Sequence, residues 1–342
     1  MTYNKSSSSS LLLIILLCFI LSPSLSGALP KPAYISLTHE NDLFTTNDRD
    51  RHYTSGLRLS FISDEFDEFD KKNSSDWVRN AFNSTNLVSG DGYKRSIVYG
   101  LAQFIGTPEV VEETKEQPDD LPYSGLLYWF YSMNGQKKTK GESLTLMAGI
   151  IGPLSMSEES QKAIHRVVKS DSPRGWKHQL KNEAALNIGY DRRYLLYSSP
   201  DKKWSYHLVG TGSFHLGNIL TGGNVSFTFV LGQKGSFNPL SIKPDLMGRA
   251  TIAANSSTEK GVFFWVGAGT DIYIHTYFLD GNSFRDGPHV HKKPIVHNWF
   301  TGLGYNWLKL STHIGWIDQG KIFDGQKDGG MEYGTINITY RY

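Results

Sequence analysis

Residues 298–307 (NWFTGLGYNW) and 335–342 (TINITYRY) decide the fold class of this chain. In both stretches mostly aromatic or aliphatic residues alternate with Asn, Gly, Thr or Arg, and Phe300 is the exception. Alternation with a period of two is typical of a β-strand. An apolar face opposite a polar face suits a strand with lipid outside and polar residues inside, whereas a soluble sandwich needs wet outer faces. The pattern therefore predicts an all-β fold, an antiparallel transmembrane β-barrel.

Similar alternating or aromatic-rich segments recur along the chain, at 34–40, 53–63, 95–104, 123–132, 143–150, 184–197, 204–215, 224–231, 248–254, 262–277 and 308–316. With the two stretches above they predict a barrel of about 12 strands. The segments 64–92, 107–120 and 279–294 are polar and are predicted to be loops.

Composition excludes several classes of protein. Lys and Arg number 35 against 33 Asp and Glu, which leaves a formal charge of +2. This balance provides no long polybasic surface, so nucleic acid is not an expected partner. Cys18 is the single cysteine, which excludes an intrachain disulfide and a cysteine-based zinc site.

The N-terminal segment resembles an export signal. An apolar run at 11–21 follows Lys5, and the small residues Ser26, Gly27 and Ala28 come after it. The run is too short to span a bilayer comfortably and suits the core of a signal peptide. We therefore predict a signal peptide at 1–28 and an outer-membrane barrel domain at 29–342.

One segment departs from the β pattern. Residues 155–169 (SMSEESQKAIHRVVK) begin with a capping box, in which Ser155 is followed by Glu158 three positions later. Apolar residues then recur at helical spacing, at Ala163, Ile164, Val167 and Val168. The spacing predicts a helix in a long loop, with His165 at the edge of its apolar stripe and packed near the barrel wall.

The densest polar cluster lies near the start of the predicted barrel. Strand alternation places Glu40 and Asp42 on one face, and Thr54 lies on the polar face of the following strand. If these strands form a hairpin, Asp42 and Thr54 lie near the same strand end. Carboxylate, amide and hydroxyl oxygens suit a hard cation such as calcium. The alternative is a solvated loop with turn-forming Asn and Asp.

Several motifs together resemble the lipid A 3′-O-deacylase family of Gram-negative outer membranes. They are Glu40-Asn41-Asp42-x-Phe44, Asp50-Arg51-x-Tyr53-Thr54-x-Gly56, Gly152-Pro153, His165-Arg166 and Gly175-Trp176-x-x-Gln179. The resemblance implies a twelve-stranded barrel whose site lies between the wall and an extracellular loop helix. It also implies calcium-dependent hydrolysis of the ester that holds the 3′ acyloxyacyl chain on lipid A, with lipopolysaccharide as substrate and outer-membrane lipids as surroundings.

The resemblance also implies roles for individual residues. Asn41 and Asp42 match the family's Asn-Asp pair, Thr54 its hydroxyl on the second strand, and His165 its general base. Asp171 falls where the family has an acidic residue. We therefore expect catalysis by His165, Asn41, Asp42 and Thr54, and a Ca²⁺ ion held by Asp42, Asn41, Thr54 and Asp171. A monomer is expected.

The chain departs from the family in one loop. The family has a basic pair after the third strand, suited to lipid A phosphates, but residues 107–120 are acidic here and Lys115 is their only cation. Lys94, Arg95 or Arg174 are candidate substitutes.

Two other functions remain open from the sequence. A porin-like barrel without catalysis would use its polar interior as a pore, and His165 would be incidental. An outer-membrane phospholipase would place a serine nucleophile beside a histidine, and no clear Ser-His pair stands out in the sequence.

Overall fold

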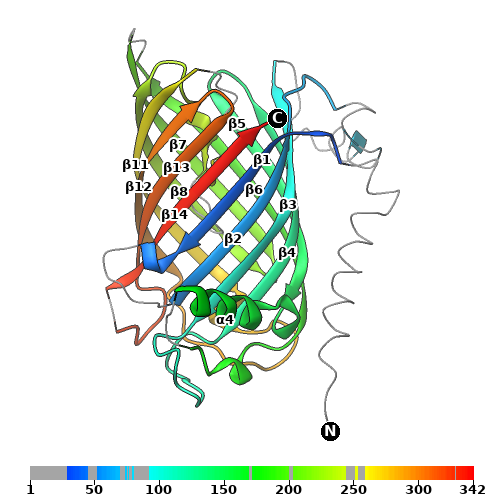
Figure 1. Ribbon diagram of the computed structural model, residues 1–342, viewed down its shortest axis with the longest axis vertical. Helices are drawn as coiled ribbons and strands as arrows, with labels where there is room; N and C mark the ends of the chain where they lie inside the picture. Colours follow the sequence, from blue (N-terminus) through cyan, green and yellow to red (C-terminus); the bar gives the residue numbers. More distant parts are fainter. Residues whose placement is uncertain are drawn as a thin grey trace.

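The computed structural model describes residues 29–44, 52–69, 74, 76, 79–80, 92–168, 172–199, 203–243, 251–252, 259–327 and 329–342. The predicted signal peptide lies outside the described residues. Twelve antiparallel strands close into a barrel, as the sequence predicts, and sequence neighbours pair all around it (Figure 1). The barrel strands are β1 (Pro32–Asn41), β2 (His52–Ser63), β3 (Lys94–Thr107), β4 (Ser124–Gln136), β5 (Lys140–Ile151), β6 (Glu183–Ser198), β7 (Trp204–Gly217), β8 (Leu220–Gln233), β11 (Gly261–Thr276), β12 (Ile295–Trp307), β13 (Leu310–Gly320) and β14 (Gly330–Arg341).

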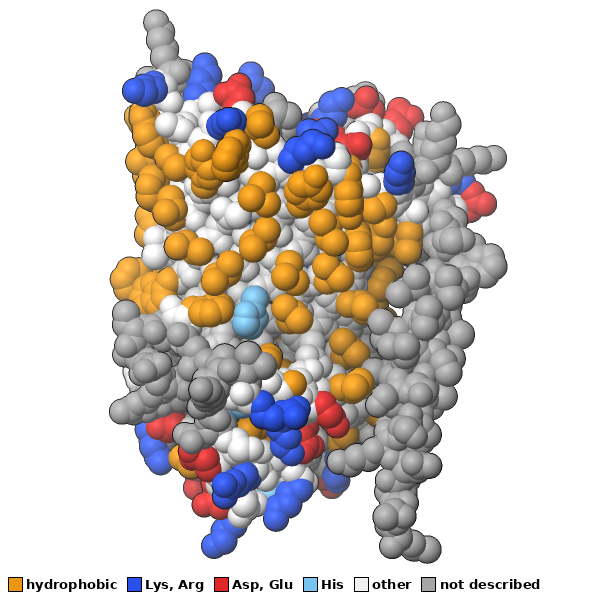
Figure 2. Space-filling view, in the orientation of Figure 1, with side chains coloured by type: hydrophobic (Ala, Val, Ile, Leu, Met, Phe, Trp, Pro, Cys, Tyr) orange, Lys and Arg blue, Asp and Glu red, His pale blue; other side chains and the backbone are white. Residues whose placement is uncertain are grey.

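The outer wall carries the apolar residues of each alternating strand. On β12, Trp299 and Trp307 are 51% and 54% exposed, whereas Asn298 and Asn306 are buried in the interior. Figure 2 shows hydrophobic side chains across the middle of the barrel, with charged side chains above and below them. This arrangement confirms the predicted two-faced wall, because lipid tails favour apolar contacts and headgroups favour charge.

The barrel interior also contains an apolar layer. Tyr128 and Phe130 of β4, Phe263 and Trp265 of β11 and Phe300 of β12 belong to one buried cluster. Since β4 and β11 are separated by four strands around the barrel wall, this cluster fills part of the lumen. The polar interior predicted from alternation is therefore only partly correct, and a packed aromatic layer is unlike a water-filled pore.

One predicted barrel strand is wrong. Of the range 248–254 the structure describes Thr251 and Ile252, and these two residues lie outside the wall, because β8 pairs directly with β11. Instead β9 (Ile242–Lys243) and β10 (Thr251–Ile252) form a separate two-stranded sheet in the connection between those strands. A two-residue pairing is too short to extend the barrel, since spanning strands need about 9–11 residues.

An even number of strands brings the start of β1 and the end of β14 to one end of the barrel, where Tyr342 N donates to Ala33 O over 3.0 Å. The opposite end carries α4 (Ser157–Val168), in the long loop between β5 and β6 (Figure 1). Outer-membrane barrels have short turns on the periplasmic side and longer loops on the extracellular side, so the α4 end is extracellular. Among the described residues, no helix is long and apolar enough to cross a membrane.

Candidate active site

The loop that carries α4 docks on the outer face of the wall through a glycine. Gly125 of β4 alternates with Leu126 and Tyr128, which lie in the luminal cluster, so Gly125 faces outward. A Cβ there would lie 2.2 Å from Ser155 Oγ and 2.3 Å from Ser157 Oγ. Ser155 ends η2 (Pro153–Ser155), and its carbonyl accepts a hydrogen bond from Gln103 Nε2 at 2.7 Å. The N-terminal end of α4 is therefore held tightly against β3 and β4.

This close approach gives a testable prediction. Gly125→Ala is expected to displace α4 and to lower the lipid A deacylation that the family resemblance implies about a hundredfold, because misplacement by an ångström can have that effect. The matched control is Gly212→Ala, since a Cβ on Gly212 of β7 meets nothing within 4 Å. Both variants should retain the heat-modifiable electrophoretic mobility of a folded barrel. Equal activity in the two variants would show that the position of α4 is not critical.

The buried face of α4 is polar rather than apolar. Ser157, Gln161 and His165 are 1%, 1% and 4% exposed, and their spacing of four residues places them on one side of the helix. Ala163 is exposed and Ile164 is only half-buried. The predicted apolar stripe toward the wall is therefore wrong for these two residues. His165 lies at the centre of the buried side and not at its edge.

The start of α4 also differs from the prediction. The helix begins at Ser157, not at Ser155, because Met156 has a left-handed backbone with φ 57° and separates η2 from α4. Ser155 contacts Ser157 through their hydroxyl oxygens at 2.9 Å and does not act as the predicted cap.

Gln161 is a site residue that the sequence reasoning missed. Its Oε1 accepts a hydrogen bond of 2.8 Å from Trp176 Nε1 in η3 (Trp176–His178), which joins α4 to the chain that follows it. Its Nε2 is buried and makes no hydrogen bond to any residue that the structure describes, so one amide donor on the His165 side of α4 faces no described acceptor. The signal in the sequence was the spacing of Gln161 and His165, four positions apart on one helix.

Asn41 and Asp42 lie at the same end of the barrel as α4. Asn41 ends β1 and Asp42 begins η1 (Asp42–Phe44), and the two are 5% and 2% exposed. Phe44 fixes η1 against β14, because a Cβ on Gly334 would approach Phe44 Cβ to 2.5 Å. An amide and a carboxylate are thus held in a buried position at the extracellular rim.

The other two predicted site residues are only partly described. Thr54 lies in β2, beside a β-bulge between Tyr53 and Ser55. Bulges are common next to active sites, because they change which side chains share a face. The role predicted for Thr54 stays a prediction. Asp171 lies outside the described residues.

An apolar wall adjoins this part of the rim. Leu37 of β1 and Leu57 of β2 are each 46% exposed on the outer face. Between them and η1 lies His39, whose Nε2 is 3.3 Å from Ser55 Oγ and whose ring contacts Phe44 edge-on at 5.3 Å. A lipid in the outer leaflet could thus place its acyl chains on the wall while its polar part lies near Asn41.

The structure separates the three candidate cations for phosphate binding. Lys94 and Arg95 begin β3 at the end opposite α4, where Lys94 Nζ is 2.6 Å from Asp67 Oδ1. Their predicted role as substitutes at the site is therefore wrong, because β3 spans the membrane between them and α4. Arg174 remains a candidate for phosphate binding. Its backbone N donates to Val111 O at 2.8 Å, which places Arg174 beside the acidic loop (residues 107–120) at the α4 end.

The acidic loop keeps its charge near this site. Backbone N–H groups of Lys115 and Thr114 lower the pKa of the exposed Glu113 carboxyl, so it is ionised at neutral pH. The loop packs on the α4 connection, because a Cβ on Gly175 would lie 2.3 Å from the Tyr123 ring and 3.1 Å from Glu113 O. Negative charge is thus built into the surroundings of α4.

The closed barrel, its apolar belt and the polar residues at its extracellular rim define an outer-membrane β-barrel protein with a candidate catalytic site. The family model described as outer membrane protein LpxR matches residues 12–342. The chain belongs to the LpxR family of outer-membrane lipid A 3′-O-deacylases, and it is therefore an ester hydrolase of the outer membrane.

One solved structure agrees with this assignment at the level of the fold, and two others superpose only weakly. LpxR from Salmonella typhimurium superposes with a TM-score of 0.72 at 16% identity, covering 90% of this chain and all (100%) of that one. The translocator domain of the autotransporter NalP from Neisseria meningitidis gives 0.37 at 10% identity, with 98% and 97% coverage. The KdgM porin gives 0.34 at 7% identity, with 90% and 99% coverage. No curated protein sequence matches the chain.

Proposed function

We propose that this chain, acting as a monomer, hydrolyses the ester of the 3′-linked acyloxyacyl chain of lipid A at the outer face of the barrel. The observation that carries this proposal is the buried position of His165 on the wall-facing side of α4, at the same end as Asn41 and Asp42. An imidazole titrates near neutral pH and can act as a base there. The adjoining apolar wall supports a lipid substrate presented from the outer leaflet.

In the proposed reaction, neutral His165 takes a proton from a water molecule as the water oxygen attacks the acyl carbonyl carbon. The tetrahedral intermediate then collapses, the bond to the sugar oxygen breaks, and that oxygen takes the proton from the His165 imidazolium. General base catalysis of this kind contributes about 10²–10⁴ in rate. The products are the free fatty acid and the sugar hydroxyl. The buried Nε2 of Gln161 is a suitable donor for an oxygen of the reacting ester.

The residues at the rim fit a calcium ion in their chemistry. Asn41 and Asp42 present an amide oxygen and a carboxylate in a buried setting, and hard oxygen donors are the ligands that Ca²⁺ takes. We infer that Asp42 and Asn41 hold it, with Thr54 and Asp171 as further ligands. Within the described part of the chain, no group of three or more His, Cys, Asp or Glu is placed to hold a metal, so the site depends on amide, hydroxyl or backbone oxygens. When bound, calcium supplies positive charge to an ester oxygen.

Lipid A phosphate has one candidate partner among the cations considered. Arg174 is exposed and lies at the α4 end, and an arginine can bind phosphate through two parallel hydrogen bonds. The neighbouring acidic loop opposes a second phosphate contact by repulsion. We therefore infer that this chain binds the lipid A phosphate more weakly than a chain with a basic pair in this loop would.

Mass spectrometry of lipid A tests the function directly. Gram-negative cells that express the chain should accumulate lipid A lighter by one acyloxyacyl group at the 3′ position, compared with cells that carry an empty vector. Lipid A of unchanged mass, together with abundant folded barrel in the outer membrane, would contradict the proposed function.

A further inference from the structure

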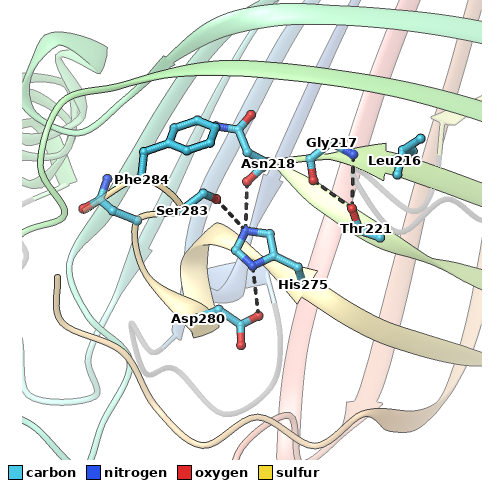
Figure 3. Close-up of a pocket in the computed structure, with 9 residues that line it drawn as sticks. Leu216, Gly217, Asn218, Thr221, His275, Asp280, Ser283 and Phe284 are labelled. Atoms are coloured by element: carbon cyan, nitrogen blue, oxygen red, sulfur yellow. Dashed lines mark hydrogen bonds and ion pairs between the residues drawn. The ribbon is translucent and has the colours of Figure 1, made fainter. Parts of the chain in front are cut away.

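A second polar cluster lies at the extracellular rim, away from α4. The loop between β11 and β12, which contains α5 (Tyr277–Asp280), and the turn between β7 and β8 line an open surface pocket of about 470 Å³ (Figure 3). Its lining includes Leu216, His275, Ser283 and Phe284. β5 and β6 separate this part of the wall from β4, on which α4 packs. The pocket is thus distinct from the site proposed above.

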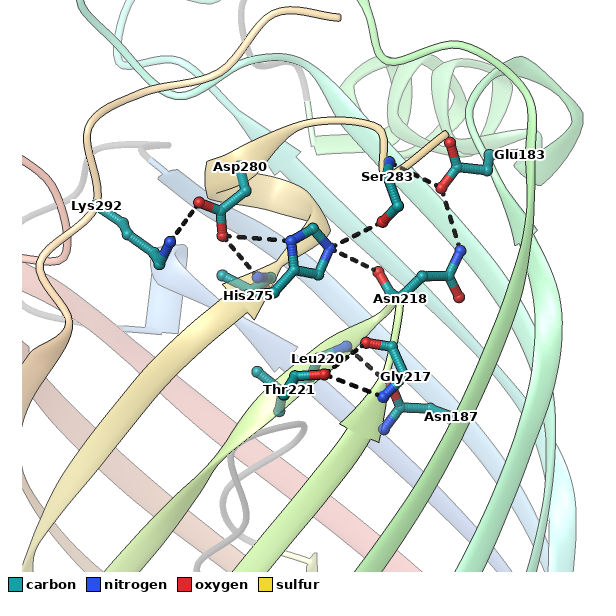
Figure 4. Close-up of polar contacts among 11 residues, drawn as sticks. Glu183, Asn187, Gly217, Asn218, Leu220, Thr221, His275, Asp280, Ser283 and Lys292 are labelled. Carbon is teal, nitrogen blue, oxygen red and sulfur yellow. Dashed lines mark hydrogen bonds and ion pairs between the residues drawn. The ribbon is translucent and has the colours of Figure 1, made fainter. Parts of the chain in front are cut away.

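Three side chains in this pocket form a nucleophile–base–acid series. Ser283 Oγ lies 3.0 Å from His275 Nε2, and His275 Nδ1 lies 3.7 Å from Asp280 Oδ2. Asp280 is held in place by Lys292 Nζ at 2.5 Å and by Thr276 N at 2.8 Å (Figure 4). A serine within hydrogen-bond reach of a histidine, itself oriented by a carboxylate, is the arrangement that activates a nucleophile, and the contacts are often longer without substrate.

The hydrogen bonds of His275 allow this role in one tautomer. Its Nε2 also lies 3.2 Å from Asn218 O, a carbonyl that can only accept. With the proton on Nε2, the ring donates to Asn218 O. With the proton on Nδ1, that N–H faces the Asp280 carboxylate across 3.7 Å, which is longer than a hydrogen bond, and Nε2 accepts a hydrogen bond from the Ser283 hydroxyl. The tautomer that can accept the Ser283 proton therefore differs from the tautomer that donates to Asn218 O only in which ring nitrogen of His275 carries the proton.

The surroundings of the pocket indicate its ligand. Leu216 and Phe284 are 53% and 76% exposed, and Ile274, beside His275 on the outer face, is 63% exposed. These side chains continue the apolar outer wall up to the polar cluster. An ester bond of a membrane lipid lies at this boundary between hydrocarbon and water, with its acyl chain on the apolar side.

We propose that Ser283, His275 and Asp280 form a second, serine-based acyl-transfer site for carboxylic esters of outer-leaflet lipids. Ser283 Oγ attacks the ester carbonyl carbon and its proton passes to His275 Nε2. The alcohol then leaves with that proton, and the acyl group remains on Ser283 until water releases it as a fatty acid. Asp280 is a positioning residue that orients His275.

The site lacks one component of fast turnover. The N–H groups of Ser283 and Phe284, the nucleophile and the residue after it, donate to Glu183 Oε1 and Oε2 at 3.0 and 3.1 Å. Such N–H groups are the usual donors of an oxyanion hole, and here a carboxylate occupies them. Slow turnover is therefore expected, so the test follows formation of the covalent bond.

The experiment treats the folded full chain, in detergent, with a small fluorophosphonate. Attack by Ser283 Oγ on phosphorus releases fluoride and leaves a phosphonylated serine, which peptide mass spectrometry locates. Wild-type protein should be labelled at Ser283, Ser283→Ala should lose this label, and His275→Gln should react about a hundredfold more slowly or less, since a general base contributes about 10²–10⁴. Asp280→Asn, which keeps an acceptor for Thr276 N, should react at least about tenfold more slowly.

Two controls make the result specific. His289→Gln alters an exposed histidine of the same loop, whose Nδ1 contacts only Gly287 O at 3.1 Å among its described contacts, and it should react like wild type. His165→Ala should also react like wild type, because that residue belongs to the other site. Absence of label at Ser283 in wild-type protein, or equal rates for His275→Gln and His289→Gln, would overturn the proposal and leave the lipid A activity unaffected.

Discussion

Replacement of His165 by alanine is expected to lower the rate of lipid A 3′-deacylation about 10²–10⁴-fold, which is the contribution of a general base. The barrel is expected to stay folded. The expectation follows from the position of His165 on the buried side of α4, at 4% exposure, where no other described histidine shares the helix face. The measurement is mass spectrometry of lipid A from cells that express each variant, with barrel folding checked by heat-modifiable mobility.

The matched control for this prediction is His178→Ala. His178 lies in η3 of the same loop, and its Nε2 contacts Thr114 O at 3.2 Å, so the variant removes a histidine from the same end of the barrel without altering the buried face of α4. It should keep near wild-type activity. Undiminished deacylation by His165→Ala would remove the imidazole from the mechanism, even if the family assignment stands.

Asp42→Asn is expected to lower deacylation at least about a hundredfold, and excess EGTA should have the same effect on the wild-type chain in outer-membrane preparations. The substitution conserves shape but removes the negative charge from a side chain that is 2% exposed. Loss of a buried carboxylate weakens the binding of a hard cation more than it disturbs packing. The measurement compares lipid A turnover across a calcium titration.

The control variant here is Asp119→Asn, which neutralises an exposed carboxylate of the acidic loop at the same end. Its activity and its calcium dependence should match those of the wild-type chain. If calcium restores chelated wild-type enzyme but Asp42→Asn requires the same calcium concentration as wild type, Asp42 is not a ligand. Activity that persists in excess chelator would exclude calcium from the reaction.

The structure also bears on the porin-like alternative. A pore needs a continuous wet lumen, but aromatic side chains such as Phe263, Trp265 and Tyr128 share one buried cluster inside the barrel. Together with membership of the LpxR family, this packing favours an enzyme. The structure supplies the feature that the phospholipase alternative requires. A Ser-His pair, which the sequence did not reveal, is present at Ser283 and His275. The two residues did not stand out as a pair in the sequence, because only the turn through α5 brings Ser283 back to His275.

The local alternation of apolar and polar residues was sufficient to predict most strands of the barrel wall. The alternation in 298–307 predicts which residues of β12 face lipid, because successive side chains in a strand point to opposite faces. It was insufficient at residues 248–254, where the pattern predicts a barrel strand but the described residues Thr251 and Ile252 pair with β9 outside the wall. The pairing register of β2 with β3 also shifts at the β-bulge between Tyr53 and Ser55. No local sequence pattern predicted that bulge.

The sequence by itself determined that this chain is a membrane barrel with a loop helix, and its motifs located the family, because two-residue periodicity and motif spacing are local properties of the chain. Only the tertiary structure decided which side of α4 is buried, that Lys94 and Arg95 lie at the wrong end of the barrel, and that Ser283 meets His275. Barrel closure sets the place of Lys94 and Arg95, the contact of α4 with Gly125 sets which side of the helix is buried, and the turn through α5 brings Ser283 to His275. Each position depends on contacts outside a single regular strand or helix, so no periodicity within one segment can encode it.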